Sequence, residues 1–321
     1  MRNRTRVVQW LRERWLETAL LLGLAVVAGW IGSVAHSFVP VPQATPTTVA
    51  GVGEFSGESS LSFVADQLAI GSRPTGTENG RRTGDYIIKR LSEFGWNTEV
   101  QHFTYRDVPG RNIIAKAGTG PVVIIGAHYD TRKRSDRDPD PNRRQAPVPG
   151  ANDGASGVAV LLELARTLDI EKLRNEVWLV FFDAEDNGNL DSWEFSAGSE
   201  YMAAHLSAAP AQVVIVDMIG DSDQVIYKER NSTPKLQEQI WAIAARLGYE
   251  DQFVPTYKWS ISDDHIPFLR RGYPAIDLID FDYPFWHTTQ DTIDKLSAES
   301  LERVGRVLQT YIEQDSQNPN E

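Results

Sequence analysis

The amino-acid sequence predicts an α/β fold with a mixed, largely parallel central sheet that helices flank on both faces. Strand and helix signals alternate along the chain from about residue 58 onward. Several strand segments are continuously apolar, as in VVIIG at 122–126 and VWLVFF at 177–182, which is typical of strands covered on both faces. The 321 residues, nine of them Trp, suffice for one large core.

Apolar residues at helical spacing predict the helices, and short runs rich in β-branched and aromatic residues predict the strands. In chain order, two helices precede three strands, and helices and strands then alternate to the C-terminus. The helices are expected at 59–69, 79–94, 155–168, 199–205, 234–247 and 298–314, and the strands at 98–105, 112–117, 122–126, 176–182, 213–216 and 275–279. The run at 131–149, rich in Asp, Arg and Pro, is expected to be a solvated loop.

The N-terminal part of the chain has a different composition. Residues 1–18 form a basic arm with five Arg, and residues 19–41 are almost free of charge, which predicts a transmembrane signal anchor with the arm in the cytoplasm. Residues 42–57 are expected to form a linker, and 58–321 an extracytoplasmic domain. The alternative is a cleavable signal peptide ending near Ser33-Val34-Ala35, which would make the protein secreted.

Charge and cysteine content exclude two classes of site. The net charge of −12 argues against a nucleic-acid partner, because phosphate binding needs a surplus of Lys and Arg. The chain has no Cys, so a transition metal has to be held by His and carboxylate side chains.

Acidic and His side chains follow the apolar strands where each strand ends. In an open α/β sheet, ligands bind outside the carboxyl ends of the strands, so these side chains are expected to converge. Zinc accepts imidazole and carboxylate ligands, and a catalytic site keeps one position open. The candidates are His128, Asp130, Glu185, Asp186, Asp217 and His287, with Asp153 in the loop that opens the helix at 155–168. Of the adjacent pair Glu185 and Asp186, one can bind metal while the other moves protons.

These motifs resemble those of the zinc-dependent exopeptidase superfamily, which contains leucyl-type aminopeptidases and glutaminyl-peptide cyclotransferases. The resemblance covers about 61–313 and rests on the residues around His128, GANDGASG at 150–157, FFDAED at 181–186, VDMIG at 216–220 and WHTTQDT at 286–292. It implies the phosphorylase/hydrolase-like zinc exopeptidase fold and an enzyme that acts on the N-termini of peptides or proteins.

The aminopeptidase members imply a centre with two zinc ions. His128 and Asp217 would hold one ion, Asp186 and His287 the other, and Asp153 would bridge them. Glu185 would be the general base, and Asp130 would orient His128 from outside the ligand set. Many members carry Glu at the position of Asp186, so this carboxylate is one methylene shorter.

The cyclotransferase members imply one zinc ion, on Asp153, Asp186 and His287. The run DDHIPFLRRG at 263–272 is very similar to that branch, in which the residue matching Asp263 joins those matching Glu185 and Asp217 in a hydrogen-bonded carboxylate chain. Zinc would polarise the γ-carboxamide of an N-terminal Gln, and Glu185 would carry a proton from the α-amine to the departing ammonia.

Two Trp are expected to line the substrate pocket in the cyclotransferase reading, Trp286 and Trp193. Against this reading, GANDGASG and TTQDT look more like aminopeptidases. The first interpretation is therefore a glutaminyl cyclase, an aminoacyltransferase, with a di-zinc metallo-aminopeptidase as the alternative. A cell-surface binding domain without catalysis is the minor alternative, and the intact Glu185 speaks against it.

Overall fold

The structure is a computed structural model that describes residues 53–315. The expectations for the basic arm, the anchor and all but the last residues of the linker lie outside these residues. Within 53–315, no helix has the length and apolar content needed to span a bilayer.

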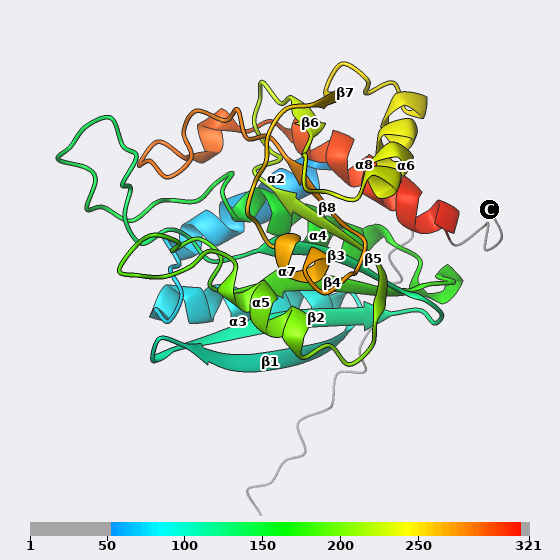
Figure 1. The fold of residues 1–321 in the computed structure, drawn as a ribbon, viewed down its shortest axis with the longest axis horizontal. Coiled ribbons are helices and arrows are strands. Elements are labelled where there is room, and N and C mark those ends of the chain that lie inside the picture. Colours follow the sequence, from blue (N-terminus) through cyan, green and yellow to red (C-terminus); the bar gives the residue numbers. More distant parts are fainter. Residues whose placement is uncertain (1–52, 316–321) are drawn as a thin grey trace, which may run out of the picture. The chain divides into compact units, whose positions relative to one another are not determined.

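The central sheet has the strand order β1-β2-β4-β3-β5-β8 (Figure 1). The first two strands form an antiparallel hairpin, and β2 pairs antiparallel with β4. The strands β4, β3, β5 and β8 are all parallel, which confirms a mixed, largely parallel sheet. The strands span β1 Asn97–Tyr105, β2 Val108–Ala117, β3 Val122–His128, β4 Glu176–Phe182, β5 Pro210–Asp217 and β8 Ala275–Ile279.

Helices cover both faces of this sheet, as expected (Figure 1). One face packs on α2, α3, α4, α6 and α8, and the other on α5 and α7. These helices span α2 Gly57–Ile70, α3 Glu78–Glu93, α4 Ala155–Thr167, α5 Ala197–Ala204, α6 Pro234–Arg246, α7 Ile266–Leu269 and α8 Ala298–Asp315.

Strand β3 shows why the sheet is buried on both sides. Successive side chains point to opposite faces of a strand. Val123 and Ile125 therefore join the larger core cluster, under α4, whereas Val122 and Ile124 join the smaller one, under α5 and α7. All four side chains are apolar because neither face meets water.

The short elements were not expected. A second sheet pairs β6, Ile226–Lys228, with β7, Phe253–Tyr257, and there are 3-10 turns at Ile170–Lys172 and Ile293–Lys295. Such elements are too brief to carry a hydrophobic period. The folded part also begins before Glu58, because Phe55 is buried in the core.

The segment 131–149 is not the solvated loop that its composition predicts. Its tip is exposed, but Arg132, Ser135, Asp138 and Val148 are buried. The Asp138 carboxylate accepts a hydrogen bond from the backbone N–H of Thr289, 2.9 Å away. Polar residues are buried here because they bind other loops of the domain, which composition does not reveal.

Candidate metal centre

The expected site residues meet at the carboxyl end of the parallel strands. His128 and Asp217 are the last residues of β3 and β5, and Glu185 and Asp186 follow β4. His287 lies in the loop after β8. Figure 1 shows the loops that follow β3, β4 and β8 on the same side of the molecule.

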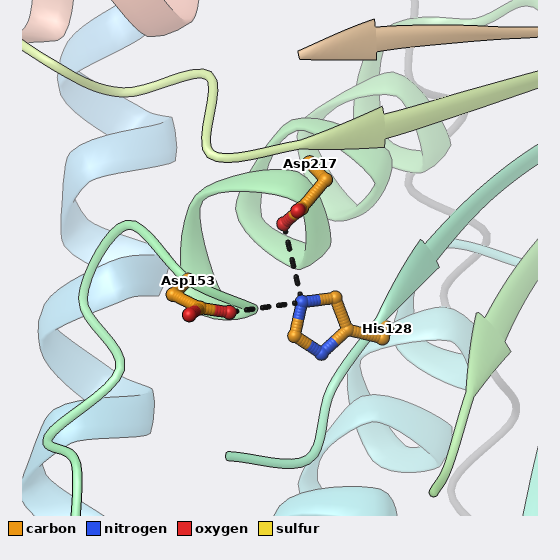
Figure 2. Close-up of side chains that lie close together, drawn as sticks. All are labelled: His128, Asp153 and Asp217. Atoms are coloured by element: carbon orange, nitrogen blue, oxygen red, sulfur yellow. Dashed lines mark hydrogen bonds and ion pairs between the residues drawn. The ribbon is translucent and has the colours of Figure 1, made fainter. Parts of the chain in front are cut away.

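His128, Asp153 and Asp217 form the first group of possible metal ligands (Figure 2). The Nε2 atom of His128 lies 3.1 Å from Oδ1 of Asp217 and 3.3 Å from Oδ1 of Asp153. Burial alone would lower the pKa of His128, but Asp130, Asp153 and Asp217 raise it well above its ordinary value.

Asp153, Asp186 and His287 form the second group. The Nε2 atom of His287 lies 2.8 Å from Oδ1 of Asp186 and 3.6 Å from Oδ2 of Asp153. In each group the donor atoms lie within 4.8 Å of one another. Asp153 thus turns one carboxylate oxygen toward each His, which is the arrangement of a bridging ligand.

The donors of the second group fit a zinc ion. Asp153, Asp186 and His287 are all buried, and the Oδ2 atom of Asp186 has no hydrogen-bond partner among the described residues. Burial, and then the charge of Asp153, raise the pKa of Asp186 to about 6. Burial likewise raises the pKa of Asp217 to about 7. Carboxylates packed this closely need a cation to stay ionised together, and zinc takes this combination of imidazole and carboxylate.

Three non-Gly residues at or beside the donors have positive φ angles. Ala184 comes just before the acidic pair, Met218 follows Asp217, and His287 is itself a candidate ligand. Their φ angles are 63°, 47° and 58°, in the left-handed region that non-Gly residues rarely adopt. Strain of this kind persists where the surrounding structure fixes the backbone, and it is typical of functional sites.

The loop that carries Asp153 depends on a glycine and on an aspartate. Gly154 has φ 98°, and a Cβ there would lie 2.8 Å from the carbonyl oxygen of Asp130 and 3.1 Å from Cε1 of His128. The Asp291 carboxylate accepts hydrogen bonds from the N–H groups of Asn152 and Asp153. The sequence reading did not find Asp291, although it lies four residues after His287.

Asp130 lies beside His128, as expected, and has a second set of contacts. Its backbone oxygen is 3.2 Å from Nδ1 of His128, and its carboxylate is 3.7 Å from the same atom. The carboxylate also accepts hydrogen bonds from the backbone N–H groups of Glu185 and Asp186, at 3.0 and 3.3 Å. Asp130 therefore holds the acidic pair as well as the imidazole.

Arg73 is a buried cation that the sequence reading missed. Its guanidinium donates to the backbone oxygens of Tyr129, Pro149 and Gly150, at 2.8, 3.2 and 2.7 Å. Burial lowers its pKa to about 10, against the opposing effect of Asp291 and other nearby carboxylates. The only sequence signal is an Arg before the turn PTGT, which does not reveal burial.

Glu185 contacts Ser196 and lies near other acids. Its Oε1 atom accepts a hydrogen bond from the Ser196 hydroxyl at 3.3 Å. Burial raises the pKa of Glu185 well above its ordinary value; His128 opposes this, and Asp263 and Asp264 add to it. Asp263 is 4% exposed and lines the same cavity as Glu185 and Asp217.

The donors open into a cavity of about 310 Å³. Trp286 lines it, as expected, together with Phe195 and Phe281. Trp193 does not line it: the Trp193 ring packs against Tyr105 at 5.1 Å, in a small cluster beside β1. The insertion after the acidic pair does supply an aromatic wall, but through Phe195, whose ring stacks on His287 at 6.4 Å.

A helix-covered mixed sheet with His and carboxylate donors at its strand ends defines the class of zinc-dependent exopeptidase-like enzymes. Residues 112–312 match the model of peptidase family M28, and the chain belongs to that family. It is accordingly a zinc-dependent enzyme.

Known relatives carry two different activities in their names. The structure of a Porphyromonas gingivalis glutaminyl cyclase has a TM-score of 0.76 and 32% identity, and the match covers 81% of this chain and 99% of that one. A leucine aminopeptidase precursor from Bacteroides thetaiotaomicron has a TM-score of 0.77 and 29% identity, covering 83% and 99%. A glutaminyl-peptide cyclotransferase-like protein of Bos taurus is 26% identical over 273 residues, 72% of this chain and 68% of that protein.

Proposed function

We propose that this protein is a glutaminyl-peptide cyclotransferase, which converts the N-terminal Gln of peptides into pyroglutamate and releases ammonia. The observation that carries the proposal is the position of Asp263, buried in the same cavity as Glu185 and Asp217. Among bacterial relatives of known structure, the glutaminyl cyclase from Porphyromonas gingivalis supports the same reading.

One zinc ion would be held by Asp153, Asp186 and His287, the group with the more deeply buried donors. Zinc would polarise the γ-carboxamide carbonyl of the substrate Gln. In this reading His128 holds Asp217 through the 3.1 Å contact and binds no metal.

The protein's own side chains would move one proton. Glu185 takes a proton from the α-amine as the amine nitrogen bonds to the carboxamide carbon. Glu185 then gives this proton to the departing NH₂ group as the old C–N bond breaks, so that ammonia leaves. Asp217 and Asp263 line the same cavity beside Glu185, and burial raises the pKa of Asp217 to about 7. Trp286 and Phe195 hold the reacting groups together and limit water.

A di-zinc aminopeptidase is the second candidate, and the position of Asp153 favours it. Its two oxygens face His128 and His287, as a bridging ligand requires. His128 and Asp217 would then hold the second zinc ion, and Glu185 would be the general base on a water molecule.

One experiment separates the two candidates. The purified full-length protein is offered a peptide with an N-terminal Gln and, separately, Leu-p-nitroanilide, and its zinc is counted by elemental analysis. Ammonia release with one zinc supports the cyclotransferase. Nitroaniline release with two zinc ions contradicts it.

The variant Asp263→Asn gives an independent test. A cyclotransferase should lose most of its activity, whereas an aminopeptidase should keep it. Asp280→Asn is the matched control, because Asp280, like Asp263, is a buried acid. The Asp280 carboxylate follows β8, accepts hydrogen bonds from the N–H groups of Val225 and Asp282, and does not line the cavity.

We also propose that residues 19–41 anchor the enzyme in a membrane, with the catalytic domain outside the cytoplasm. The support is the charge-free apolar run beside the Arg-rich arm. The full-length protein should stay with the membrane after carbonate washing. A soluble product whose N-terminus begins near residue 36 would instead show cleavage and secretion.

A further inference from the structure

Arg137 lies at the mouth of the cavity with its guanidinium free. The residue is exposed, and its guanidinium lies over the ring of Trp286, 3.8 Å from the ring centroid. Within residues 53–315, no carboxylate lies within 4.0 Å of it and no carbonyl accepts from it. Arg137 can therefore still donate to a ligand.

The other arginine of the cavity wall is already occupied. Arg132 binds the Asp136 carboxylate with two nitrogens, at 2.6 and 3.1 Å. A third nitrogen of Arg132 donates to the backbone oxygen of Asp186 at 2.7 Å. Among the described residues that line the cavity, Arg137 is thus the arginine without an acidic partner.

The contacts around Arg137 fix its position. Its backbone N–H donates to the backbone oxygen of His287 at 3.3 Å, and the next residue, Asp138, binds Thr289. The guanidinium also packs on the flat face of the Trp286 ring in a cation–π contact. A guanidinium held in this way loses little freedom when it binds a ligand.

One residue of substrate can span the distance from the reacting centre to Arg137. The Trp286 and His287 rings are 4.2 Å apart, so the guanidinium lies at most about 8 Å from the His287 ring. Consecutive Cα atoms are about 3.8 Å apart, and a side chain adds several ångströms more. A substrate with its N-terminal Gln at His287 would bring its second residue to Arg137.

We propose that Arg137 selects substrates with a carboxylate one residue after the N-terminal Gln, which rests on the proposed function. Arg binds a carboxylate through two parallel N–H donors, a geometry that neutral side chains do not match. The acidic groups of the cavity do not prevent this. Four of them are buried, the half-buried Asp217 contacts His128, and the exposed Asp136 is paired with Arg132.

The test measures kcat/KM for three C-terminally amidated peptides, Gln-Glu-Ala, Gln-Gln-Ala and Gln-Lys-Ala. The Glu peptide should be preferred to the Gln peptide by about tenfold, mainly through KM, and Lys should be the poorest. Comparing kcat/KM for Gln-Ala as the free acid and as the amide shows whether Arg137 also binds the α-carboxylate of a dipeptide.

Variants at Arg137 test whether its charge causes the preference for the Glu peptide. Arg137→Gln should remove it, Arg137→Lys should keep part of it, and Arg137→Glu should reverse it in favour of the Lys peptide. Arg143→Gln is the matched control: Arg143 is exposed on the same loop but does not line the cavity. Zinc content and Tm are measured for each variant.

The outcomes separate this inference from the proposed function. If Gln-Gln-Ala amide is turned over and kcat/KM is equal for the Glu and Gln peptides, the role of Arg137 is wrong. The proposed cyclotransferase activity is then unaffected. A preference that survives in Arg137→Gln also overturns the role of Arg137. If no Gln peptide is turned over, the proposed function fails, and the role of Arg137 fails with it.

Discussion

The adjacent acids Glu185 and Asp186 differ in what their side chains contact. Asp186 faces His287, whereas Glu185 faces Ser196 and lies near Asp263. Both residues lie beyond the end of β4, where the chain bends and Ala184 has φ 63°, so the path of this loop sets the two directions. The two neighbours can therefore take different roles, one at the metal and one at the substrate.

Replacing Glu185 should abolish turnover without changing the metal. We expect Glu185→Gln to lower kcat by about 100- to 10,000-fold, the usual contribution of a general acid or base. Zinc content and Tm should be unchanged, because Gln has nearly the same shape as Glu and Glu185 is in neither group of possible metal ligands. Steady-state kinetics and elemental analysis check this, and near-normal kcat would disprove the assigned role.

Arg73 should affect zinc affinity without touching zinc. Its guanidinium joins Tyr129 to Pro149 and Gly150 through three backbone oxygens, and Lys cannot replace all three bonds. We expect Arg73→Lys to weaken zinc binding by about 10- to 100-fold, as for other partners just outside a ligand set. Competition with a chelator measures this. The exposed Arg81→Lys is the control and should bind zinc normally.

Among the elements, sequence predicted those long enough to show a period. The expected strand at 176–182 matches β4, and the expected helix at 234–247 is one residue longer than α6. The short β6 and α7 left no such signal. Segment 131–149 was misjudged because its Asp and Arg bind other loops, and only the folded chain shows which polar residues find such partners.

In the site, too, sequence predicted what a local pattern marks and missed what depends on tertiary contacts. Strand ends revealed His128, Asp217 and the acidic pair, because parallel strands bring their carboxyl ends to one edge. Sequence could not distinguish Trp193 from Phe195, two residues apart in one insertion. Which ring reaches the cavity depends on the path of the loop.

The loop 150–154 gives a prediction at this scale. Gly154→Ala should weaken zinc binding, because the added Cβ would press on the backbone of Asp130 and the ring of His128. Gly95→Ala is a matched control with φ 83° and no atom within 4 Å of the added Cβ. Both changes strain the backbone, because both φ angles are positive. Only Gly154→Ala should lose zinc in chelator titrations, and equal zinc affinities would contradict the role of Gly154.

For the whole molecule, the excess of buried acids predicts how stability depends on pH. Burial raises the pKa of Asp183 to about 7 and those of Asp280 and Asp291 to about 6, against an ordinary value of 3.8. Between about pH 4 and 7 the folded state therefore binds more protons than the unfolded state. The contribution of these groups is complete below pH 4 and is lost as pH rises through the folded pKa values.

The metal-free protein should accordingly have a lower Tm at pH 8 than at pH 5. Zinc should reduce this difference, because a bound cation favours the ionised carboxylates around it and stabilises the folded state. Calorimetry with and without a chelator measures both effects. A metal-free Tm that rises between pH 5 and 8 would show that other groups dominate the balance.

The five candidate donors are spread from His128 to His287, about 160 residues apart. At roughly 5–20 residues per second, a ribosome takes about 8–30 s to make that stretch. During this interval the nascent chain holds His128 and Asp153 but lacks the second His. Loading of the complete centre is therefore a late event in biosynthesis, so bound zinc can serve as a measure of how much of the newly made enzyme has reached its final form.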